Sequence, residues 1–242
     1  MMNDFVLRLE SDQPRNDLED QLRQFEPWGH LIEFSNGAST GNLERRVPFA
    51  VNPTQKASIV FDSIQSDQLR GGRLLDIGCN SGYSSIFAAT TYDMRPTGID
   101  VNPRHIEVST MLAGFANIDA EFKLADAETY TEQDEYDLVF HFGTLYHLPN
   151  PLMSLASTFR NLKSGGWVAI ETQIYEGADP NECYYIHMHN NDRTNFWALS
   201  PSVLRSYMEF IGFESYSEIL RVTPKAMEKE GMHRTISIAR KP

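Results

Sequence analysis

The chain has 242 residues, 41% of them hydrophobic, and a net charge of −12 from 33 acidic and 21 basic side chains. This length fits one α/β domain with a modest extension, and no segment approaches the ~20 apolar residues of a membrane span. The acidic balance opposes non-specific binding to a phosphate backbone, although Arg45–Arg46 and residues 234–241 are locally basic. Because the start lacks signal-peptide features and the two cysteines (Cys79, Cys183) make a disulfide framework unexpected, we expect a cytoplasmic protein without a membrane partner.

The N-terminal part differs from the rest of the chain. Apolar residues at helical spacing predict a helix over residues 14–25, and the glycine-rich polar stretch 35–42 predicts a loop. Asn52–Pro53 is a good helix start, because the Asn side chain can cap and proline suits the first helical position. We therefore expect an N-terminal extension or cap over residues 1–52 and a main domain over 53–242.

Strands and helices then alternate in the main domain. After the helix that begins at Pro53, the expected strands are 73–77, 97–100, 120–124, 136–142 and 167–172, and the expected helices are 82–91, 103–115 and 151–162. Such alternation favours a parallel, doubly wound sheet.

The alternation stops after residue 172. Residues 173–199 are polar, aromatic and histidine-rich without a clear period, and loops of this length are usually functional, so we expect a substrate lid there. Ser200–Pro201 starts a helix that Gly212 ends. The last two expected strands, 215–222 and 235–240, suit an antiparallel edge hairpin.

A short motif predicts the chemistry. Asp76 lies at the end of an apolar run, and the turn after it contains Gly78, Asn80 and Gly82, while a second apolar run ends in Asp100. In an open α/β sheet, ligands bind at the carboxyl ends of adjacent strands. We expect the two glycines to leave room for a ligand, and Asn80 to tolerate a positive φ. Asp76 would repel a pyrophosphate but can pair with an α-ammonium group.

The second acid completes this interpretation. Asp100 can accept hydrogen bonds from both ribose hydroxyls, so the two acids suit a ligand with an amino-acid end and a ribose end, which S-adenosylmethionine has. The alternative is a structural strand-turn-helix without cofactor, because short motifs give false positives.

The ordered set of motifs resembles the class I S-adenosylmethionine-dependent methyltransferases. It consists of Asp76-x-Gly78-x-x-x-Gly82, Asp100, Asp126 and the closing antiparallel pair, and covers roughly residues 53–242. The resemblance implies a Rossmann-like sheet of about seven strands with an antiparallel final strand. It also implies cofactor contacts beyond the first motif: Val101 beside the adenine, Asp126 and the Ala127 amide near its exocyclic amine, and the Phe142 backbone. Cys79, in the turn of the first motif, is counted among the cofactor-binding residues and is expected to pack there rather than act as a nucleophile.

A narrower resemblance comes from four segments: 143–147 (GTLYH), 170–172 (IET), 195–201 (NFWALSP) and 238–242 (IARKP). They are similar to the tRNA wobble-uridine carboxymethyltransferases and their small-molecule methyltransferase relatives. That family uses carboxy-S-adenosyl-L-methionine and holds its extra carboxylate with basic and aromatic residues; Tyr146, Arg234 and Lys56 fall at such positions.

The chain departs from this family in two ways. Gly29–His30 stands beside Pro27–Trp28, where the family places a basic lysine, and the acidic net charge is unfavourable for tRNA. We therefore expect ordinary S-adenosyl-L-methionine, with the carboxylated form as the less favoured cofactor.

The candidate catalytic residues follow the fourth expected strand, and the candidate substrate residues come from several parts of the chain. The candidate catalytic residues are His147 and Tyr146, which lie next to the expected methyl-transfer centre; His147 could take a proton from a hydroxyl or amine nucleophile, or it could be structural. His187 and His189 could share a metal, but no evident acid or cysteine completes a ligand set, so we expect no metal there. The residues expected to bind substrate are Trp28, His30, Glu171, His187, His189, Arg193 and Arg234, with Asn190 and Asn191 in the same polar cluster.

These features predict an enzyme that transfers a methyl group to an oxygen or nitrogen of a small molecule. One alternative is a tRNA wobble-uridine (carboxy)methyltransferase, with tRNA as partner. Another is a non-catalytic cofactor-binding partner subunit. The sequence is compatible with a homodimer and does not determine the oligomeric state.

Overall fold

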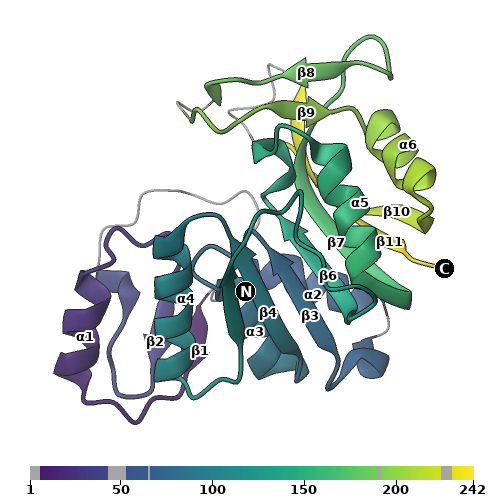
Figure 1. Cartoon of the computed structure of the whole chain (residues 1–242). Helices are drawn as coiled ribbons and strands as arrows, with labels where there is room; N and C mark the ends of the chain where they lie inside the picture. The colour runs from purple at the N-terminus through teal and green to yellow at the C-terminus, as the bar shows by residue number, and fades with distance from the viewer. Residues whose placement is uncertain (1–5, 43–52, 65, 190–191, 225–230) are drawn as a thin grey trace.

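A computed structural model describes residues 6–42, 53–64, 66–189, 192–224 and 231–242. Arg45–Arg46, Asn52 and Asn190–Asn191, which the sequence analysis singled out, lie outside these ranges. A twisted sheet forms the centre of the molecule, in the order β10-β11-β7-β6-β3-β4-β5 (Figure 1). The strands are β3 (Arg73–Ile77), β4 (Arg95–Asp100), β5 (Glu121–Leu124), β6 (Tyr136–Phe142), β7 (Leu162–Tyr175), β10 (Glu214–Val222) and β11 (Met232–Arg240).

This topology confirms the predicted fold class. The strands from β5 to β7 are parallel, while β11 runs antiparallel to both β7 and β10. The strand order reverses between β3 and β6, because the chain leaves β3 toward β4 and β5 and then returns to β6 on the other side of β3. A crevice therefore opens beyond the carboxyl ends of these strands, which is where ligands bind in such sheets.

Helices cover both faces of the sheet. They are α2 (Pro53–Ser63), α3 (Tyr83–Tyr92), α4 (Pro103–Phe115), α5 (Pro151–Asn161) and α6 (Pro201–Ile211). Successive strand residues point to opposite faces, so Leu74 packs in the cluster of α2 and α3, whereas Leu75 packs in that of α5 and α6. None of the helices in the described part of the chain is long and apolar enough to cross a membrane.

Capping explains why several helix boundaries could be predicted. The Asn102 side chain accepts a hydrogen bond from the Arg104 amide at 3.0 Å, with Pro103 in the first helical position of α4. Ser200 accepts from the Val203 amide at 3.1 Å at the start of α6, and Gly212 ends that helix. These signals act over a few residues and need no tertiary context.

The N-terminal extension packs against α3 and α4 (Figure 1). Its predicted helix is α1 (Arg15–Arg23), and two strands that the sequence analysis did not anticipate, β1 (Leu7–Leu9) and β2 (Ile32–Phe34), pair in parallel. Three residues are too few to show a strand period, which explains the omission. The extension buries Leu18 and Leu22 with Ile86 and Leu112 in one cluster.

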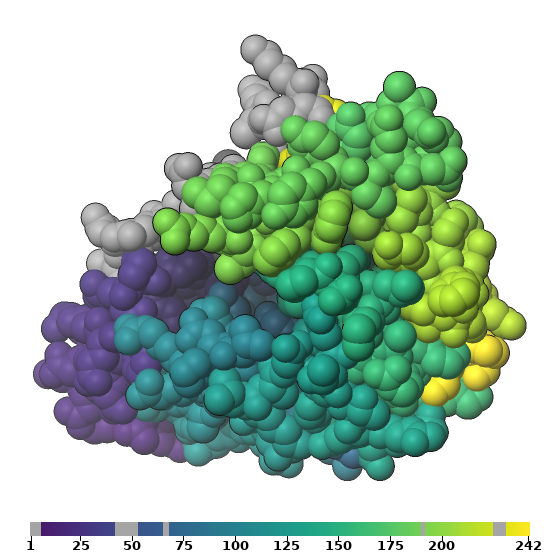
Figure 2. Space-filling view, turned by 45° about the horizontal axis from the view of Figure 1, so that its top comes forward, coloured from purple at the N-terminus to yellow at the C-terminus, as the bar shows by residue number. Residues whose placement is uncertain are grey.

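The expected lid segment contains more regular structure than predicted. β7 continues to Tyr175 because β11 pairs with it from Trp167 to Tyr175, where Met232 is the last partner. β8 (Cys183–Tyr185) and β9 (Trp197–Leu199) form a short antiparallel pair, and β9 joins β7 at Ile174. In Figure 2 this light green segment overhangs a hollow between the purple extension and the teal part of the main domain.

Gly82, which precedes α3, offers a test of this packing. Its φ is +72°, and an added Cβ would meet the Ser109 Cβ at 2.8 Å and the Phe122 ring at 2.9 Å. We expect Gly82→Ala to lower the free energy of unfolding by about 1–3 kcal/mol, from backbone strain and overpacking. Gly114→Ala is the control, because nothing lies within 4 Å of its added Cβ. Urea unfolding that shows equal stability for the two variants would contradict this account.

Candidate functional site

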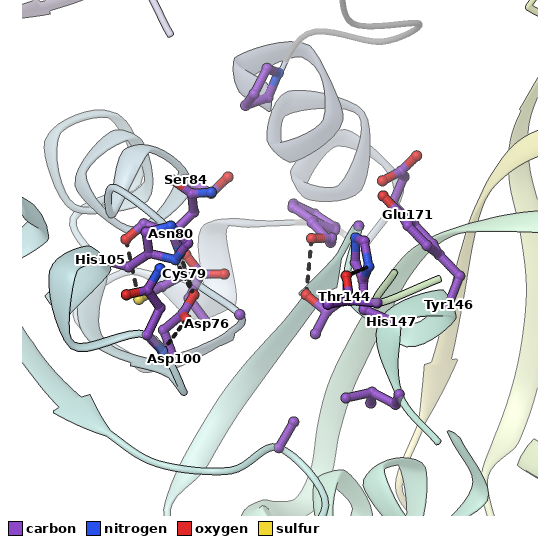
Figure 3. A pocket seen from close by; sticks show the side chains of 18 of the residues that line it. Asp76, Cys79, Asn80, Ser84, Asp100, His105, Thr144, Tyr146, His147 and Glu171 are labelled. Atoms are coloured by element: carbon purple, nitrogen blue, oxygen red, sulfur yellow. Dashed lines mark hydrogen bonds and ion pairs between the residues drawn. The ribbon is translucent and has the colours of Figure 1, made fainter. Parts of the chain in front are cut away.

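A cavity of about 1260 Å³ lies beyond the carboxyl ends of β3, β4 and β6. Figure 3 shows two groups of side chains around it. Asp76, Asn80, Asp100 and His105 gather at one end, and Tyr146, His147 and Glu171 gather at the other. The cavity is thus lined by residues of the extension, of the carboxyl ends of β3, β4 and β6, and of the β8–β9 connection.

The turn after β3 has the backbone that its sequence requires. Gly78 and Asn80 have φ values of +71° and +50°, so Asn80 does adopt the left-handed conformation expected of it. An added Cβ at Gly78 would meet the Thr144 hydroxyl at 2.2 Å, and Gly82 is crowded by α4 and β5. Gly82 does not line the cavity, and the lack of a side chain there serves helix–sheet packing; its contact with the cofactor stays a prediction.

Asp76 is a buried acid at this end of the cavity. The Ser85 hydroxyl donates a hydrogen bond to its Oδ2 at 2.6 Å. Burial raises the pKa of Asp76 to about 6, because desolvation outweighs the hydrogen bonds from Ser85, and Asp100 raises it further. Cys79 is buried beside it and its thiol pKa is raised, again mainly by burial, so it is a packed side chain and not an activated nucleophile.

Asp100, the last residue of β4, is held in place by two backbone amides and lies beside His105. The backbone amides of Asn80 and Asn102 donate to it at 3.1 and 2.9 Å, and the His105 Nδ1 lies 3.1 Å from its Oδ2. Burial alone would raise the pKa of Asp100, but these hydrogen bonds lower it. The carboxylate is thus ionised and oriented at the cavity wall.

The residues expected around an adenine divide into two groups. Val101 is 67% exposed and lines the cavity, as do Ala127 and Phe142. Asp126 is exposed, does not line the cavity, and accepts a hydrogen bond from the Glu128 amide at 2.7 Å. Its carboxylate therefore caps the turn after β5, which was the less favoured alternative for this residue.

At the opposite end of the cavity, Glu171 bridges two cations. The Lys56 ammonium donates to its Oε2 at 2.8 Å, and the Arg234 guanidinium binds both oxygens, at 2.7 and 2.8 Å. Arg234 also lies over the Tyr146 ring, 4.9 Å from its centroid. Strand pairing explains the Arg234–Glu171 contact, because Arg234 lies diagonally across from Glu171 on the same face.

The charges of this cluster do not cancel. Burial alone would raise the pKa of Glu171, but Arg234 and Lys56 outweigh it and lower the pKa to about 2. Glu171 is therefore ionised although its side chain is only 1% exposed. Two cations and one carboxylate leave an excess positive charge at this end of the cavity.

His147 lies next to this cluster, in the short helix η3 (Leu145–His147). Its Nδ1 is 2.8 Å from the Thr194 hydroxyl, and the ring lies 4.2 Å from that of Tyr146, centroid to centroid. Burial lowers the pKa of His147; Asp192 and a backbone hydrogen bond with Thr194 raise it, and Arg234 lowers it. The net direction is down, so the imidazole is neutral at pH 7 and able to accept a proton.

The remaining predicted substrate residues are scattered. His30 lines the cavity, with its Nδ1 3.2 Å from the Ser81 hydroxyl, and His189 also lines it. Trp28 does not: it is buried within the extension and donates to the Leu22 carbonyl, and its closure over the cofactor stays a prediction. His187 is exposed and stacks on Tyr185, and Arg193 is exposed. Neither of these two lines the cavity.

Several lining residues escaped the sequence analysis. His105 could have been found, because it falls in the first turns of the helix that follows Asp100. Gln173, Asp192, Thr194 and Asn195 had no such signal, since they depend on how the 173–199 segment folds back. Among the described residues, no three histidine, cysteine, aspartate or glutamate side chains converge as a metal site.

Comparisons with known proteins identify the family. A family model described as a methyltransferase domain matches residues 54–218. The tRNA U34 carboxymethyltransferase of Aliarcobacter butzleri (strain RM4018) is 28% identical over 154 residues, which are 61% of this chain and 49% of that protein. The 27-O-demethylrifamycin SV methyltransferase of Amycolatopsis mediterranei (strain S699) is 34% identical over 103 residues, 41% of this chain and 38% of that protein. The chain thus spans about half or less of the length of these curated relatives.

A solved structure agrees on the fold. The N-terminal domain of EvdMO1, crystallised in the presence of SAH and D-fucose, superposes with a TM-score of 0.75 at 16% identity, covering 95% of this chain and 98% of that one. The match to the methyltransferase-domain model extends over most of the main domain, and the sheet order and the turn after β3 agree with it. The chain therefore belongs to the class I S-adenosylmethionine-dependent methyltransferases.

Proposed function

We propose that this protein transfers the methyl group of S-adenosylmethionine to an oxygen or nitrogen of a small-molecule acceptor, with His147 as the general base. The observation that carries the proposal is the arrangement of the cavity. Asp76 and Asp100 lie at one end, and a neutral histidine lies at the other, beside a buried charged cluster. A cofactor held by the two acids would extend toward the histidine.

The described residues fit this cofactor. Asp76 is a buried carboxylate whose raised pKa means that it would gain from a cationic partner, which the α-ammonium group of the cofactor provides. Asp100 is ionised and fixed, as a ribose-binding acid must be. Val101 exposes an apolar side chain to the cavity, where an adenine ring would cover it. When bound, the cofactor supplies an electrophilic methyl group on a sulfonium with a neutral thioether leaving group.

The protein has two tasks at the acceptor end of the cavity. It must hold the nucleophile in line with the methyl carbon, and most of the acceleration in such a displacement comes from this positioning. It must also remove a proton from a hydroxyl or amine, and general-base help of this kind contributes a smaller factor. The neutral imidazole of His147 can accept that proton.

Two features support an acceptor that is a small molecule. The net charge of −12 opposes binding to an extended phosphate backbone. The β8–β9 segment overhangs the cavity, as Figure 2 shows, and so limits the room above it. An acceptor that reaches His147 would contact residues of this segment, including Thr194 and Asn195.

A second candidate is carboxymethyl transfer to a tRNA wobble uridine. It is favoured by the relatives of that activity and by the convergence of Lys56, Tyr146 and Arg234, which the resemblance associates with the carboxylate of the carboxylated cofactor. Glu171 counts against it, because this carboxylate already binds both cations. The excess positive charge of the cluster would still attract the additional carboxylate of that cofactor, so the experiment below includes this candidate.

One experiment separates the candidates. One sample of the purified protein is denatured, and the ligand that it releases is analysed by mass spectrometry. A second, native sample is tested for methyl transfer from labelled S-adenosylmethionine to a fractionated metabolite pool. We expect the ordinary cofactor or its demethylated product, and label in a small product. Retention of the carboxylated cofactor with salt-dependent tRNA binding would favour the second candidate. Tight cofactor binding without any labelled product would point to a non-catalytic partner subunit.

Asp100 supplies a prediction about cofactor affinity. We expect Asp100→Ala to weaken S-adenosylmethionine binding by more than about tenfold, because a charge-assisted hydrogen bond contributes roughly 1.5–3 kcal/mol. Isothermal titration calorimetry measures this directly. The control is Asp126→Ala, since Asp126 does not line the cavity and its change should leave the affinity within about twofold. Unchanged affinity in Asp100→Ala would refute the ribose assignment.

Asp76 supplies a prediction about pH. Its pKa is raised to about 6, so it is mostly ionised at pH 7 and mostly protonated at pH 5. The α-ammonium group favours the carboxylate form, so we expect cofactor affinity to fall as the pH drops from 7 to 5, with proton release on binding near pH 6. Calorimetry in buffers of different ionisation enthalpy detects that proton. Asp76→Asn should bind weakly with little pH dependence; an equally steep profile in this variant would assign the effect elsewhere.

A further inference from the structure

The β8–β9 connection contacts His147 through two polar side chains that the proposed mechanism has not yet used. The Thr194 hydroxyl lies 2.8 Å from the His147 Nδ1, and the same hydroxyl donates to the Asp192 Oδ1 at 2.6 Å. The Asp192 Oδ2 lies 3.9 Å from the His147 Nδ1. A histidine, a hydroxyl and a carboxylate therefore form a continuous chain at the edge of the cavity.

We propose that Thr194 and Asp192 are positioning residues that hold His147 in the neutral form with its proton on Nδ1, leaving the lone pair of Nε2 as the base of the acceptor site. The use of that lone pair in methyl transfer rests on the proposed function. The tautomer of His147 and its dependence on Thr194 and Asp192 do not rest on the proposed function, and they can be measured separately.

The direction of the hydrogen bonds supports this assignment. An ionised carboxylate only accepts hydrogen bonds, so the single Thr194 hydroxyl proton is committed to Asp192 in the 2.6 Å contact. The hydroxyl oxygen can then only accept from the His147 Nδ1, which must carry a proton. Asp192 is ionised, as this arrangement requires. Burial raises its pKa, but the hydrogen bonds from Thr194 outweigh this effect and the net direction is down. The side-chain contacts of the ring with the Thr194 hydroxyl and with Asp192 both involve Nδ1.

Backbone and side-chain contacts hold the β8–β9 connection against the histidine. The Phe196 amide donates to the Tyr146 carbonyl at 2.8 Å, next to His147 in the chain. The Trp197 indole donates to the Pro149 carbonyl at 3.2 Å. Thr194 lies two residues before Phe196. Its hydroxyl therefore belongs to a segment that hydrogen-bonds to residues directly beside His147 in the chain.

The charges around the ring suit a proton acceptor. When the nucleophile loses its proton, that proton goes to Nε2, and the resulting imidazolium keeps its Nδ1 proton on Thr194. The Asp192 carboxylate then faces a cation rather than a neutral ring. Arg234 and the Tyr146 ring also lie near His147. Burial is the main reason that the pKa of His147 is low and the imidazole neutral before the transfer, and the Arg234 charge adds to this effect.

The test is ¹⁵N NMR of the full chain labelled at its seven histidines, with the His147 signals assigned by their loss in His147→Asn. Coupling of ring protons to the two nitrogens reports which one carries the proton. We expect Nδ1–H for His147 in the wild-type protein near pH 7.5. We expect Thr194→Val to lose this preference and Thr194→Ser to keep it, since serine retains the hydroxyl.

A pH titration of the same signals tests Asp192. Asp192→Asn should lower the pKa of His147, because Asp192 raises it in the wild-type protein. Asp179→Asn is the matched control: Asp179 also accepts from the amide two residues on, at 2.8 Å, but does not line the cavity. It should leave both tautomer and pKa unchanged. Thr194 and Asp179 are exposed, so neither substitution opens a buried cavity.

Two results would overturn the proposal. One is a wild-type His147 with its proton on Nε2, and the other is a tautomer and pKa that Thr194→Val and Asp192→Asn leave unchanged. None of these readouts requires methyl transfer. A protein that shows the expected tautomer but transfers no methyl group would therefore refute the proposed function and leave the positioning of His147 standing.

Discussion

Replacing Glu171 by glutamine is expected to lower the free energy of unfolding by about 3–5 kcal/mol, because it leaves Lys56 and Arg234 as buried cations without their shared carboxylate. A loss of this size is a large part of the 5–15 kcal/mol that typically stabilises a domain. Urea unfolding at pH 7 measures it. Adding Lys56→Met to the variant should recover part of the loss, since it removes one of the uncompensated charges.

The pH dependence of this loss has a definite sign. The pKa of Glu171 is about 2 in the folded protein, against an ordinary value of 4.5. A carboxyl group whose pKa is depressed by folding stabilises the protein fully above its unfolded pKa, and this contribution is lost as the pH falls toward the folded value. The stability difference between wild type and Glu171→Gln should therefore be constant near neutral pH and shrink as the pH falls from about 4.5 to 2.

Glu209→Gln is the matched control for this prediction. Glu209 also pairs with an arginine, Arg205, but both side chains are more than half exposed. Exposed pairs of this kind contribute roughly 0.3–0.5 kcal/mol, so the control should unfold almost like the wild type. If Glu171→Gln were no less stable than Glu209→Gln, the buried charge cluster would not have the energetic role given to it here.

Replacing His147 by asparagine is expected to lower kcat for methyl transfer by about 10²- to 10⁴-fold, the usual contribution of a general base. The measurement is release of labelled product from S-adenosylmethionine once the acceptor has been found by the metabolite screen. Cofactor affinity, followed by calorimetry, should change little, because the two acids that would bind the cofactor lie at the other end of the cavity (Figure 3).

The pH profile distinguishes a base from a structural histidine. The pKa of His147 lies below its ordinary value of 6.5, so the neutral base dominates at pH 7, and wild-type kcat should fall at more acidic pH as the imidazole takes up a proton. This acid limb should disappear in His147→Asn. His187→Asn is the control, since His187 is an exposed histidine that does not line the cavity. Comparable losses in the two variants would remove His147 from the mechanism.

Local signals predicted much of the fold. The strand over residues 73–77 and the helix over 103–115 have the bounds expected from the sequence. Both follow from short-range physics: an apolar run that must be buried, and an Asn–Pro pair that caps a helix in any context. The positive φ of Asn80 belongs to the same class, because few other residues tolerate it. The domain boundary near residue 52 stays a prediction.

The amino-acid sequence by itself determined the alternation of strands and helices from α2 to β7, the helix caps and the two acids at the ends of adjacent strands, because each depends on residues close together in the chain. Only the tertiary structure decided that Lys56 and Arg234 share Glu171, 115 and 63 residues away, and that Thr194 reaches His147 across 47 residues. It also decided that Asp126 does not line the cavity and that Trp28 is buried in the extension. The physical reason is that side-chain partners across a sheet edge depend on strand register and on how one segment folds over another, and neither is encoded in local spacing.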